Sequence, residues 1–345
     1  MSQTTVIAFP QTKVVVFPIV ESPSAVRSRT WAGKAILALL LVSLGLIAFT
    51  LARPLALYDL STRARLWAAG INGTYSVVDG HRIHYFVGGS GTGETIVLIH
   101  GVNGRAQDWS NLMPQFARAG YQVYAIDLLG YGKSDRPADA AYSVAQETKI
   151  VEDFMAQKHM QRVNLMGWSL GGWIAARIAL EKPQIVDRLV LYDSAGIRFG
   201  MGVGPDTFQP DTPRKLDVLY GLLMPDPVHF PAIVARDLIR RFQESSWVMD
   251  RSVRSMLTGK DALDGKLQAI KIPTLIVWGK QDHLIPVTSG EAMHQQIHQS
   301  VLEIFDGCGH MAPGQCADAV GPDTIEFLRS QPGMQARTVQ VPAAE

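Results

Sequence analysis

The sequence has few of the features that mark metal, redox or nucleic-acid-binding proteins. Only two of its 345 residues are cysteines, Cys308 and Cys316, and they are too far apart to form a Cys-x-x-Cys pair. The formal net charge is +1, and no stretch forms a basic stripe. We therefore expect no metal site, no cofactor and no nucleic-acid partner. We expect the cysteines to be free thiols, the alternative being a disulfide in an oxidising compartment.

Charge is also missing from a long stretch near the N-terminus. Residues 35–52 are uncharged and lie between Lys34 and Arg53. At about 1.5 Å per residue, this run is barely long enough to cross a hydrocarbon core of about 30 Å, and it lacks the polar face of a soluble core helix. We expect a single-pass membrane anchor at 34–53, whose orientation the flanking charges do not decide. The alternative is a cleaved signal peptide of a secreted or periplasmic protein.

The rest of the chain divides by composition into a globular core and flanking segments. Prolines interrupt residues 1–33, which favours a tail without regular structure. Strand and helix patterns then alternate, except in a proline-rich stretch at 196–270. The predicted segments are a tail at 1–33, the anchor at 34–53, a juxtamembrane linker helix at 54–74, a core at 75–195 and 271–332, a helical cap at 196–270 and a C-terminal tail at 333–345.

Apolar strands alternate with helices along the core. Asp79-Gly80, between two alternating segments, predicts a hairpin. The almost continuous apolar run at 95–99 is typical of a strand buried on both faces of a parallel sheet. The pattern predicts an α/β fold with one mostly parallel, doubly wound sheet. A stretch as long as 196–270 without strands is usually functional, so we expect it to cover the carboxyl edge of the sheet.

A Gly-x-Ser-x-Gly motif at 167–171 lies between a predicted strand and a predicted helix. A serine on such a turn is held out of the sheet by strained backbone, while Gly167 and Gly171 leave room for neighbouring elements. A serine hydroxyl becomes an effective nucleophile when a nearby base takes its proton. Ser169 is therefore the candidate nucleophile.

Candidate partners for Ser169 lie in later loops. Asp282 and His310 each follow an apolar predicted strand, which places both at the same sheet edge as Ser169. His310 is the expected general base, and Asp282 is expected to orient its imidazole. The backbone N–H groups of Leu170 and Val102 are the expected donors to the oxyanion.

Further residues have alternative or supporting roles. Asp193 also follows a strand and is the alternative acid, although we expect it to bond nearby backbone. Asp127 ends a strand in a glycine-rich turn and is expected to be structural. Apolar side chains of the cap either pack it onto the core or line an acyl-binding pocket. The candidate substrate contacts are Trp168, Phe199, Met201 and Met224.

Five motifs lie in order between Tyr75 and Arg329. They are His-Gly at 100–101, Asp-Leu-Leu-Gly-Tyr-Gly-Lys-Ser at 127–134, Gly-Trp-Ser-Leu-Gly-Gly at 167–172, Trp-Gly-Lys-Gln-Asp at 278–282 and Gly-Cys-Gly-His at 307–310. Together they resemble the α/β-hydrolase fold superfamily. With the apolar segment, the chain is similar to the membrane-anchored monoacylglycerol lipases of animals and to a group of bacterial lipases and esterases. This resemblance implies hydrolysis of small-molecule or lipid esters through an acyl-serine.

Two other functions stay open at this point. Carbon–carbon bond hydrolases of ring-cleavage products use the same serine, acid and histidine. A non-catalytic relative that serves as a binding protein usually lacks one of the three, and none is missing here. The apolar segment favours a lipid-phase substrate, and the carbon–carbon bond hydrolase stays possible. The sequence assigns neither an acyl chain length nor an oligomeric state.

Overall fold

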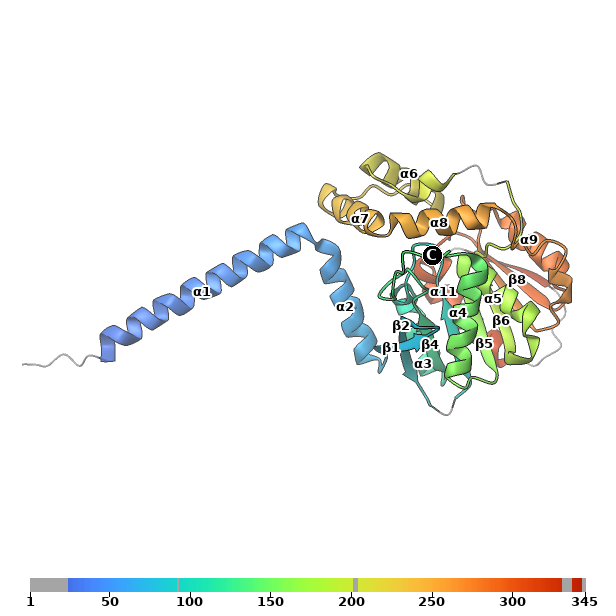
Figure 1. Cartoon of the computed structure of the whole chain (residues 1–345), viewed down its shortest axis with the longest axis horizontal. Helices are drawn as coiled ribbons and strands as arrows, with labels where there is room; N and C mark the ends of the chain where they lie inside the picture. Colours follow the sequence, from blue (N-terminus) through green and yellow to red (C-terminus); the bar gives the residue numbers. More distant parts are fainter. Residues whose placement is uncertain (1–23, 92, 201–203, 331–336, 343–345) are drawn as a thin grey trace, which may run out of the picture. The chain divides into compact units, whose positions relative to one another are not determined.

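The chain divides between Leu51 and Ala52 into two units, each of which is described by itself. A computed structural model describes residues 24–91, 93–200, 204–330 and 337–342. Helix α1 (Ser24–Ala52) includes an exposed apolar stretch, Trp31–Ala52, of 22 residues with a mean hydropathy of 2.7 (Figure 1). This length and composition fit a membrane anchor or a signal sequence. The helix begins inside the segment expected to be a tail, and residues 1–23 of that segment lie outside the described residues.

A single sheet forms the centre of the second unit. Within the described residues its strands run in the order β1-β2-β4-β3-β5-β6-β7-β8-β9. Strand β2 pairs antiparallel with β1 and β4, and the other neighbours are parallel. The predicted α/β fold and hairpin are therefore confirmed. The strands are β1 (Asn72–Val78), β2 (His81–Gly89), β3 (Thr95–Ile99), β4 (Gln122–Ile126), β5 (Val163–Trp168), β6 (Val186–Tyr192), β7 (Thr274–Gly279), β8 (Ser300–Phe305) and β9 (Arg337–Val341).

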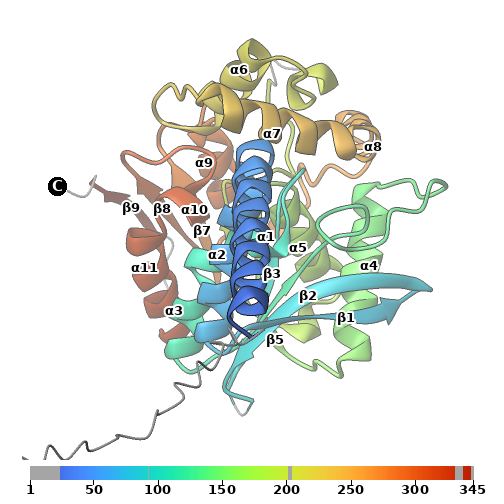
Figure 2. The ribbon, with the colours of Figure 1, turned by 90° about the vertical axis from the view of Figure 1, so that its left-hand side faces the viewer.

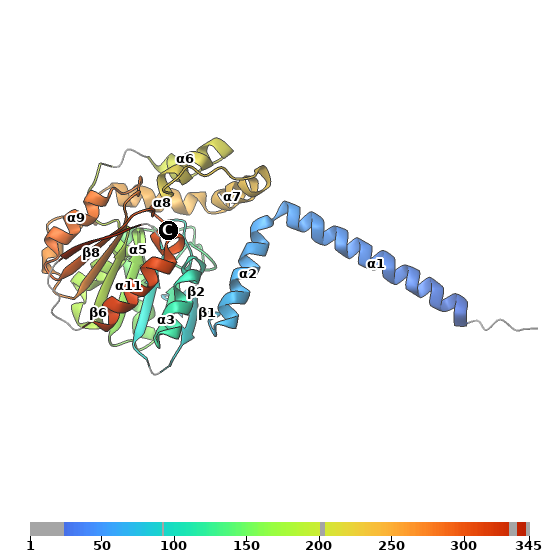
Figure 3. The ribbon, with the colours of Figure 1, turned by 180° about the vertical axis from the view of Figure 1, so that it is seen from behind.

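Helices cover both faces of the sheet. Figure 1 shows α4 and α5 in front of it, and Figure 3, from behind, shows α3 and α11 on the opposite face. Successive side chains of a strand point to opposite faces of the sheet, so Leu165 and Met166 belong to separate apolar cores. The helices flanking the sheet, with short 3₁₀ turns η, are η1 (Ala106–Asn111), α3 (Met113–Arg118), α4 (Val144–Gln157), α5 (Leu170–Glu181), η2 (Pro183–Ile185), η4 (Leu267–Ala269), α9 (Val287–Gln296), α10 (Ala312–Gln315) and α11 (Ala317–Arg329).

The regular elements in the described part of 196–270 are helices, joined by loops, as the lack of strand patterns predicts. It contains η3 (Pro205–Phe208), α6 (Pro213–Leu223), α7 (Ala232–Glu244) and α8 (Ser246–Leu257). Figure 2 shows α6, α7 and α8 above the sheet, whose ends β1 and β9 lie on opposite sides of the view. The cap helices share a small apolar core of their own, formed by Leu216, Leu219, Ala235, Phe242, Met249 and Val253. The cap is thus a folded layer over the carboxyl edge of the strands.

Helix α2 (Pro54–Ala68) differs from the linker helix expected at 54–74, because it packs as part of the globular unit. Leu66 is fully buried in the core. Asp59 forms ion pairs with Arg105 (2.7 Å) and with Arg241 of the cap helix α7 (3.0 Å). These partners are distant in the sequence, so the local pattern of α2 does not reveal them.

Strand β9 lies within the segment expected to be a C-terminal tail at 333–345. It pairs in parallel with β8, from Val301↔Arg337 to Phe305↔Val341. An edge strand this short is stabilised by its neighbour rather than by its own sequence. The sheet therefore extends one strand beyond the predicted core.

Candidate active site

Ser169 occupies a strained turn between β5 and α5. Its φ angle is +55°, in the left-handed region that residues with side chains rarely adopt. Its N–H donates to Tyr192 O (3.0 Å), and its carbonyl accepts from Gly172 N–H (3.0 Å) and Ala195 N–H (3.1 Å). The strained backbone predicted from the motif is confirmed, and these hydrogen bonds hold it in place.

The two outer glycines of the motif permit close approach of backbone to backbone. A Cβ on Gly167 would lie 2.0 Å from Gly171 O, and a Cβ on Gly171 would lie 2.1 Å from Ile99 O. Real Cβ atoms do not approach other atoms so closely. The expectation that these glycines make room for the neighbouring strand and helix is therefore confirmed.

Asp282 and His310 meet at the ends of β7 and β8. Asp282 Oδ2 lies 2.7 Å from His310 Nδ1, and both side chains are buried. The other oxygen, Oδ1, accepts from Leu284 N–H (2.9 Å) and Ile285 N–H (2.8 Å). Because a carboxylate accepts hydrogen bonds, His310 Nδ1 is the donor, and Nε2 is left to take up a proton.

The pKa of His310 is set by two opposing influences. Burial lowers this pKa, but the negative charge of Asp282, its hydrogen bond to the ring and the charge of Asp193 outweigh burial. The net result is a pKa above the ordinary histidine value of 6.5. The imidazole is therefore a stronger base than a free histidine.

Asp193 lies close to this pair but bonds backbone groups, as the sequence predicts. Its two oxygens accept from Gly279 N–H (2.8 Å) and Ala312 N–H (3.2 Å). Burial and the nearby charge of Asp282 raise its pKa. Asp193 thus connects the loops that carry Asp282 and His310. Asp127, expected to be structural, contacts His84 Nδ1 (2.7 Å) away from these loops.

Trp168 connects the serine turn with the histidine loop. Its indole Nε1–H donates to His310 O (2.6 Å), and the two rings lie 5.9 Å apart between centroids. The structure thus places the turn that carries Ser169 next to the loop that carries His310. Trp168 stays a candidate substrate contact, and the contacts found for it here hold the loop.

Cys308 and Cys316 form a disulfide, so the prediction that both are free thiols is wrong. The helical turn of α10 brings the two Cα atoms to 6.2 Å although they are eight positions apart. The bridge closes a loop that contains His310. Within this loop, Gly309 N–H donates to Gln315 Oε1 (3.0 Å), which ties it further.

The N–H groups of Val102 and Leu170 lie beside the serine turn. Leu170 begins α5, where an N–H has no acceptor within its helix. Throughout the described part of the chain, neither N–H forms a hydrogen bond. The Gly101–Val102 peptide is held by its carbonyl, which accepts from His100 Nδ1 (2.7 Å) and Gly104 N–H (3.0 Å). Because C=O and N–H point in opposite directions across a peptide, this also fixes the direction of the Val102 N–H.

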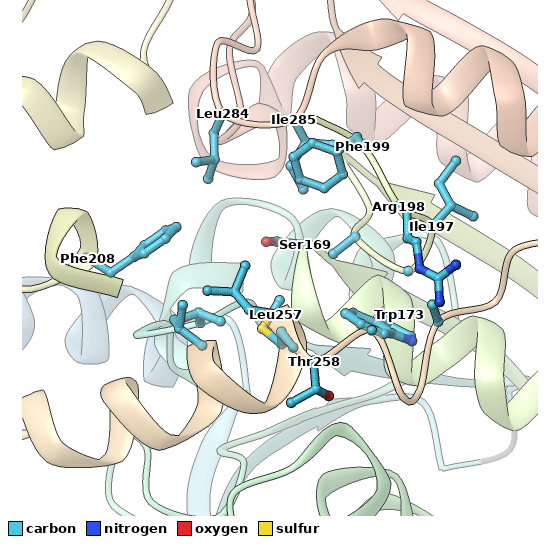
Figure 4. A pocket seen from close by; sticks show the side chains of 17 residues that line it. Ser169, Trp173, Ile197, Arg198, Phe199, Phe208, Leu257, Thr258, Leu284 and Ile285 are labelled. Carbon is cyan, nitrogen blue, oxygen red and sulfur yellow. The ribbon is translucent and has the colours of Figure 1, made fainter. Parts of the chain in front are cut away.

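A cavity of about 280 Å³ opens beside Ser169, whose oxygen is directed into it (Figure 4). Its walls come from the core, the loop after β6, the cap and the loop after Asp282. Apolar side chains dominate the lining, which favours an apolar ligand. The lining residues are Val102, Ser169, Trp173, Ala195, Gly196, Ile197, Arg198, Phe199, Phe208, Val253, Met256, Leu257, Thr258, Gly259, Ala262, Leu284 and Ile285.

The predicted substrate contacts are distributed unevenly around this cavity. Phe199 lines it, whereas Met201 lies outside the described residues. Met224 contacts the side chain of Gln315 and is absent from the described lining. Sequence reasoning missed most of the lining, because residues such as Trp173 and Thr258 belong to no motif.

Comparison with known proteins gives one family and two kinds of relative. Residues 96–321 match the family described as the alpha/beta hydrolase family. A 2-hydroxy-6-oxononadienedioate/2-hydroxy-6-oxononatrienedioate hydrolase from Cupriavidus pinatubonensis is 28% identical over 284 residues, which cover 75% of this chain and 96% of that protein.

Solved structures extend the likeness. A membrane phospholipase A, described as a bacterial virulence factor, is 28% identical with a TM-score of 0.75, covering 87% of this chain and 98% of that one. A meta-cleavage product hydrolase from Pseudomonas fluorescens has a TM-score of 0.64 at 24% identity, covering 74% and 97% of the two chains. The second likeness shows a shared fold alone.

Proposed function

Because the chain belongs to the alpha/beta hydrolase family, we propose that it is a serine hydrolase that cleaves carboxylic esters of apolar acyl groups. One observation carries this proposal. The buried Asp282–His310 pair (2.7 Å) is tied through Trp168 to the strained turn of Ser169, which opens into an apolar cavity. This arrangement supports the roles of nucleophile, base and orienting acid for Ser169, His310 and Asp282 beside a site for an acyl group.

In the proposed reaction, His310 Nε2 takes the proton of Ser169 Oγ as that oxygen attacks the ester carbonyl carbon. The N–H groups of Val102 and Leu170 stabilise the resulting oxyanion. The intermediate then collapses, the carbon–oxygen bond to the alcohol breaks, and the alcohol leaves with the proton from His310. Water then attacks the acyl carbon while His310 takes its proton. The bond between that carbon and Ser169 Oγ breaks, the carboxylic acid is released, and Ser169 regains its proton from His310. Asp282 keeps the imidazole oriented and stabilises its cationic form throughout.

The proposal is tested by the hydrolysis of p-nitrophenyl butyrate. Ser169→Ala should abolish turnover through the acyl intermediate, because no other residue is proposed to form it. What remains should be the slow reaction that substrate binding and the oxyanion donors alone support. Ser246→Ala is a matched control, since that half-buried hydroxyl lies outside the described cavity lining and donates to Gln243 O. Retained turnover in Ser169→Ala with native far-ultraviolet circular dichroism would contradict the nucleophile assignment.

Cleavage of a carbon–carbon bond in a ring-cleavage dienoate is the second candidate. A hydrolase of such compounds is 28% identical to this chain and is covered over 96% of its length. The same serine and histidine can serve either reaction. Rates on a dienoate and on a butyrate ester, measured with one enzyme preparation, separate the two functions. A dienoate preference of more than about 100-fold in kcat/KM, roughly 2.7 kcal/mol in transition-state stabilisation, would overturn the ester proposal.

We also propose that α1 anchors the protein and that the globular unit faces an oxidising compartment. The apolar stretch Trp31–Ala52 supports the anchor. The Cys308–Cys316 disulfide supports the oxidising side, since such bonds persist outside the reducing cytosol. The lipid ester expected from the sequence is consistent with this location.

A further inference from the structure

One charged side chain, that of the exposed residue Arg198, borders the cavity beside Ser169. Among the described residues that line it, Arg198 alone is charged. Its backbone N–H donates to both carboxylate oxygens of Asp264, at 3.1 and 3.2 Å, which fixes the loop that follows β6. The position of the Arg198 backbone is therefore defined independently of its side chain.

The guanidinium of Arg198 is free to bind a ligand. Within the described residues it forms no ion pair and no hydrogen bond, although Asp264 binds the N–H of the same residue. It lies against Gly259, where a Cβ would come within 3.2 Å of its Nε. The guanidinium thus occupies space that the missing side chain of Gly259 leaves open. Such a planar group with several donors binds phosphate and carboxylate strongly.

The cavity differs in charge on the two sides of Ser169. In Figure 4, Phe208 and Leu284 lie on one side of Ser169, and Arg198 lies on the other side with the apolar Trp173 and Ile197. An apolar acyl chain against Phe208 and Leu284 is farthest from the charge. With the carbonyl carbon at Ser169, the leaving group then extends toward Arg198.

We propose that Arg198 binds an anionic group on the leaving-group side of the substrate. This inference rests on the proposed serine hydrolase function and adds the class of substrate. The shared chemistry is a negatively charged oxygen group, either the phosphate of an acylglycerol phosphate or the carboxylate of a ring-cleavage dienoate. In both compounds the charge leaves with the product that is released first.

The test compares three substrates that differ in the leaving group. They are 1-hexanoylglycerol, which is neutral, 1-hexanoylglycerol-3-phosphate and a 2-hydroxy-6-oxo-dienoate. For Arg198→Gln, kcat/KM should fall about 10- to 100-fold on the preferred anionic substrate, which is the range for losing hydrogen bonds to a charged group. Hydrolysis of 1-hexanoylglycerol should change less than about twofold. Arg198→Lys should restore only part of the activity, because it loses the bidentate geometry.

Lys260→Gln is the matched control, since it removes the same charge from the neighbouring exposed loop without altering the cavity lining. Its kcat/KM should stay close to that of the native protein on all substrates. Loss on the phosphate alone identifies a phosphate ester, and loss on the dienoate alone identifies a carboxylate. Equal loss on neutral and anionic substrates in Arg198→Gln, or equal loss in Lys260→Gln, would overturn the role of Arg198. If the native protein cleaves none of the three substrates or p-nitrophenyl butyrate, the proposed function itself fails.

Discussion

Two buried carboxylates beside His310 bind different kinds of group. Asp282 accepts from the His310 ring, whereas Asp193 accepts from the N–H groups of Gly279 and Ala312. The residue that can govern the orientation and charge of the imidazole is therefore Asp282. Asp193 stabilises the backbone around it.

Asp282→Asn should lower kcat by about 10⁴-fold, because an amide facing Nδ1 favours the wrong tautomer of His310. Asp193→Asn is the control. It leaves one N–H of Gly279 or Ala312 unpaired, so it should lower the free energy of unfolding by about 1–3 kcal/mol while keeping most of the activity. Steady-state kinetics and urea unfolding of both variants measure these effects. A larger kinetic loss in Asp193→Asn would make Asp193 the acid.

The pH dependence should report the raised pKa of His310. Catalysis requires the neutral imidazole, so kcat/KM should be full at high pH and fall as pH drops through a pKa above 6.5. In Asp282→Asn the larger of the two charges that raise the pKa of His310 is gone, and burial, which lowers this pKa, remains. The acid limb of the residual activity should therefore move to lower pH. An acid limb that stays at the same pH, or moves to higher pH, would show that a group other than His310 controls the pH dependence.

At the scale of elements, the disulfide loop controls the position of His310. Cys308 and Cys316 bracket this residue, and Trp168 binds its carbonyl. The loop is therefore held from both ends and from the serine turn. This constraint is a feature of the loop as a whole rather than of one side chain.

Removing the disulfide with Cys308→Ser and Cys316→Ser should lower the free energy of unfolding by about 2–3 kcal/mol, the cost expected for opening a short loop. It should also lower kcat, since His310 lies inside the loop. Dithiothreitol should reproduce both effects in the native protein and change nothing further in the double variant. If reductant affects the two proteins equally, or neither, the disulfide does not position His310.

Local sequence patterns predicted the elements that are stabilised by residues close together in the chain. The Asp79-Gly80 turn, the apolar strands and the strained Ser169 turn follow from residues close together in the chain, and the structure contains each of them. The partners of α2 and β9 are distant in the sequence, so these elements were expected to be a linker and a tail. The cavity lining was missed for the same reason, since Val102, Phe208 and Leu284 come from three separate segments.

At the scale of the whole molecule, an apolar helix precedes a hydrolase with an apolar cavity. The proposed anchor rests on the hydropathy of 2.7 in the Trp31–Ala52 stretch, and the proposed apolar acyl group rests on the cavity lining. An enzyme anchored as proposed would meet a lipid-phase substrate in the membrane in which that substrate is dissolved.

Washing membranes with carbonate should leave the full chain in the membrane fraction. A charge at the centre of a spanning helix costs about 2.5–3.5 kcal/mol, so Leu40→Arg combined with Leu44→Arg should release the protein to the supernatant. Immunoblots of both fractions measure the distribution. Release of the native chain by carbonate, or a shorter mature protein lacking α1, would favour a signal sequence over an anchor.

The central claim, that Ser169 is the nucleophile, is tested most directly by mapping a covalent adduct. After reaction with a fluorophosphonate, trypsin should release the adduct on the peptide 163–177, in which Ser169 is the only serine. We expect one adduct per chain, on that peptide, and none in Ser169→Ala. An adduct on any other peptide, or unchanged labelling of Ser169→Ala, would contradict the account.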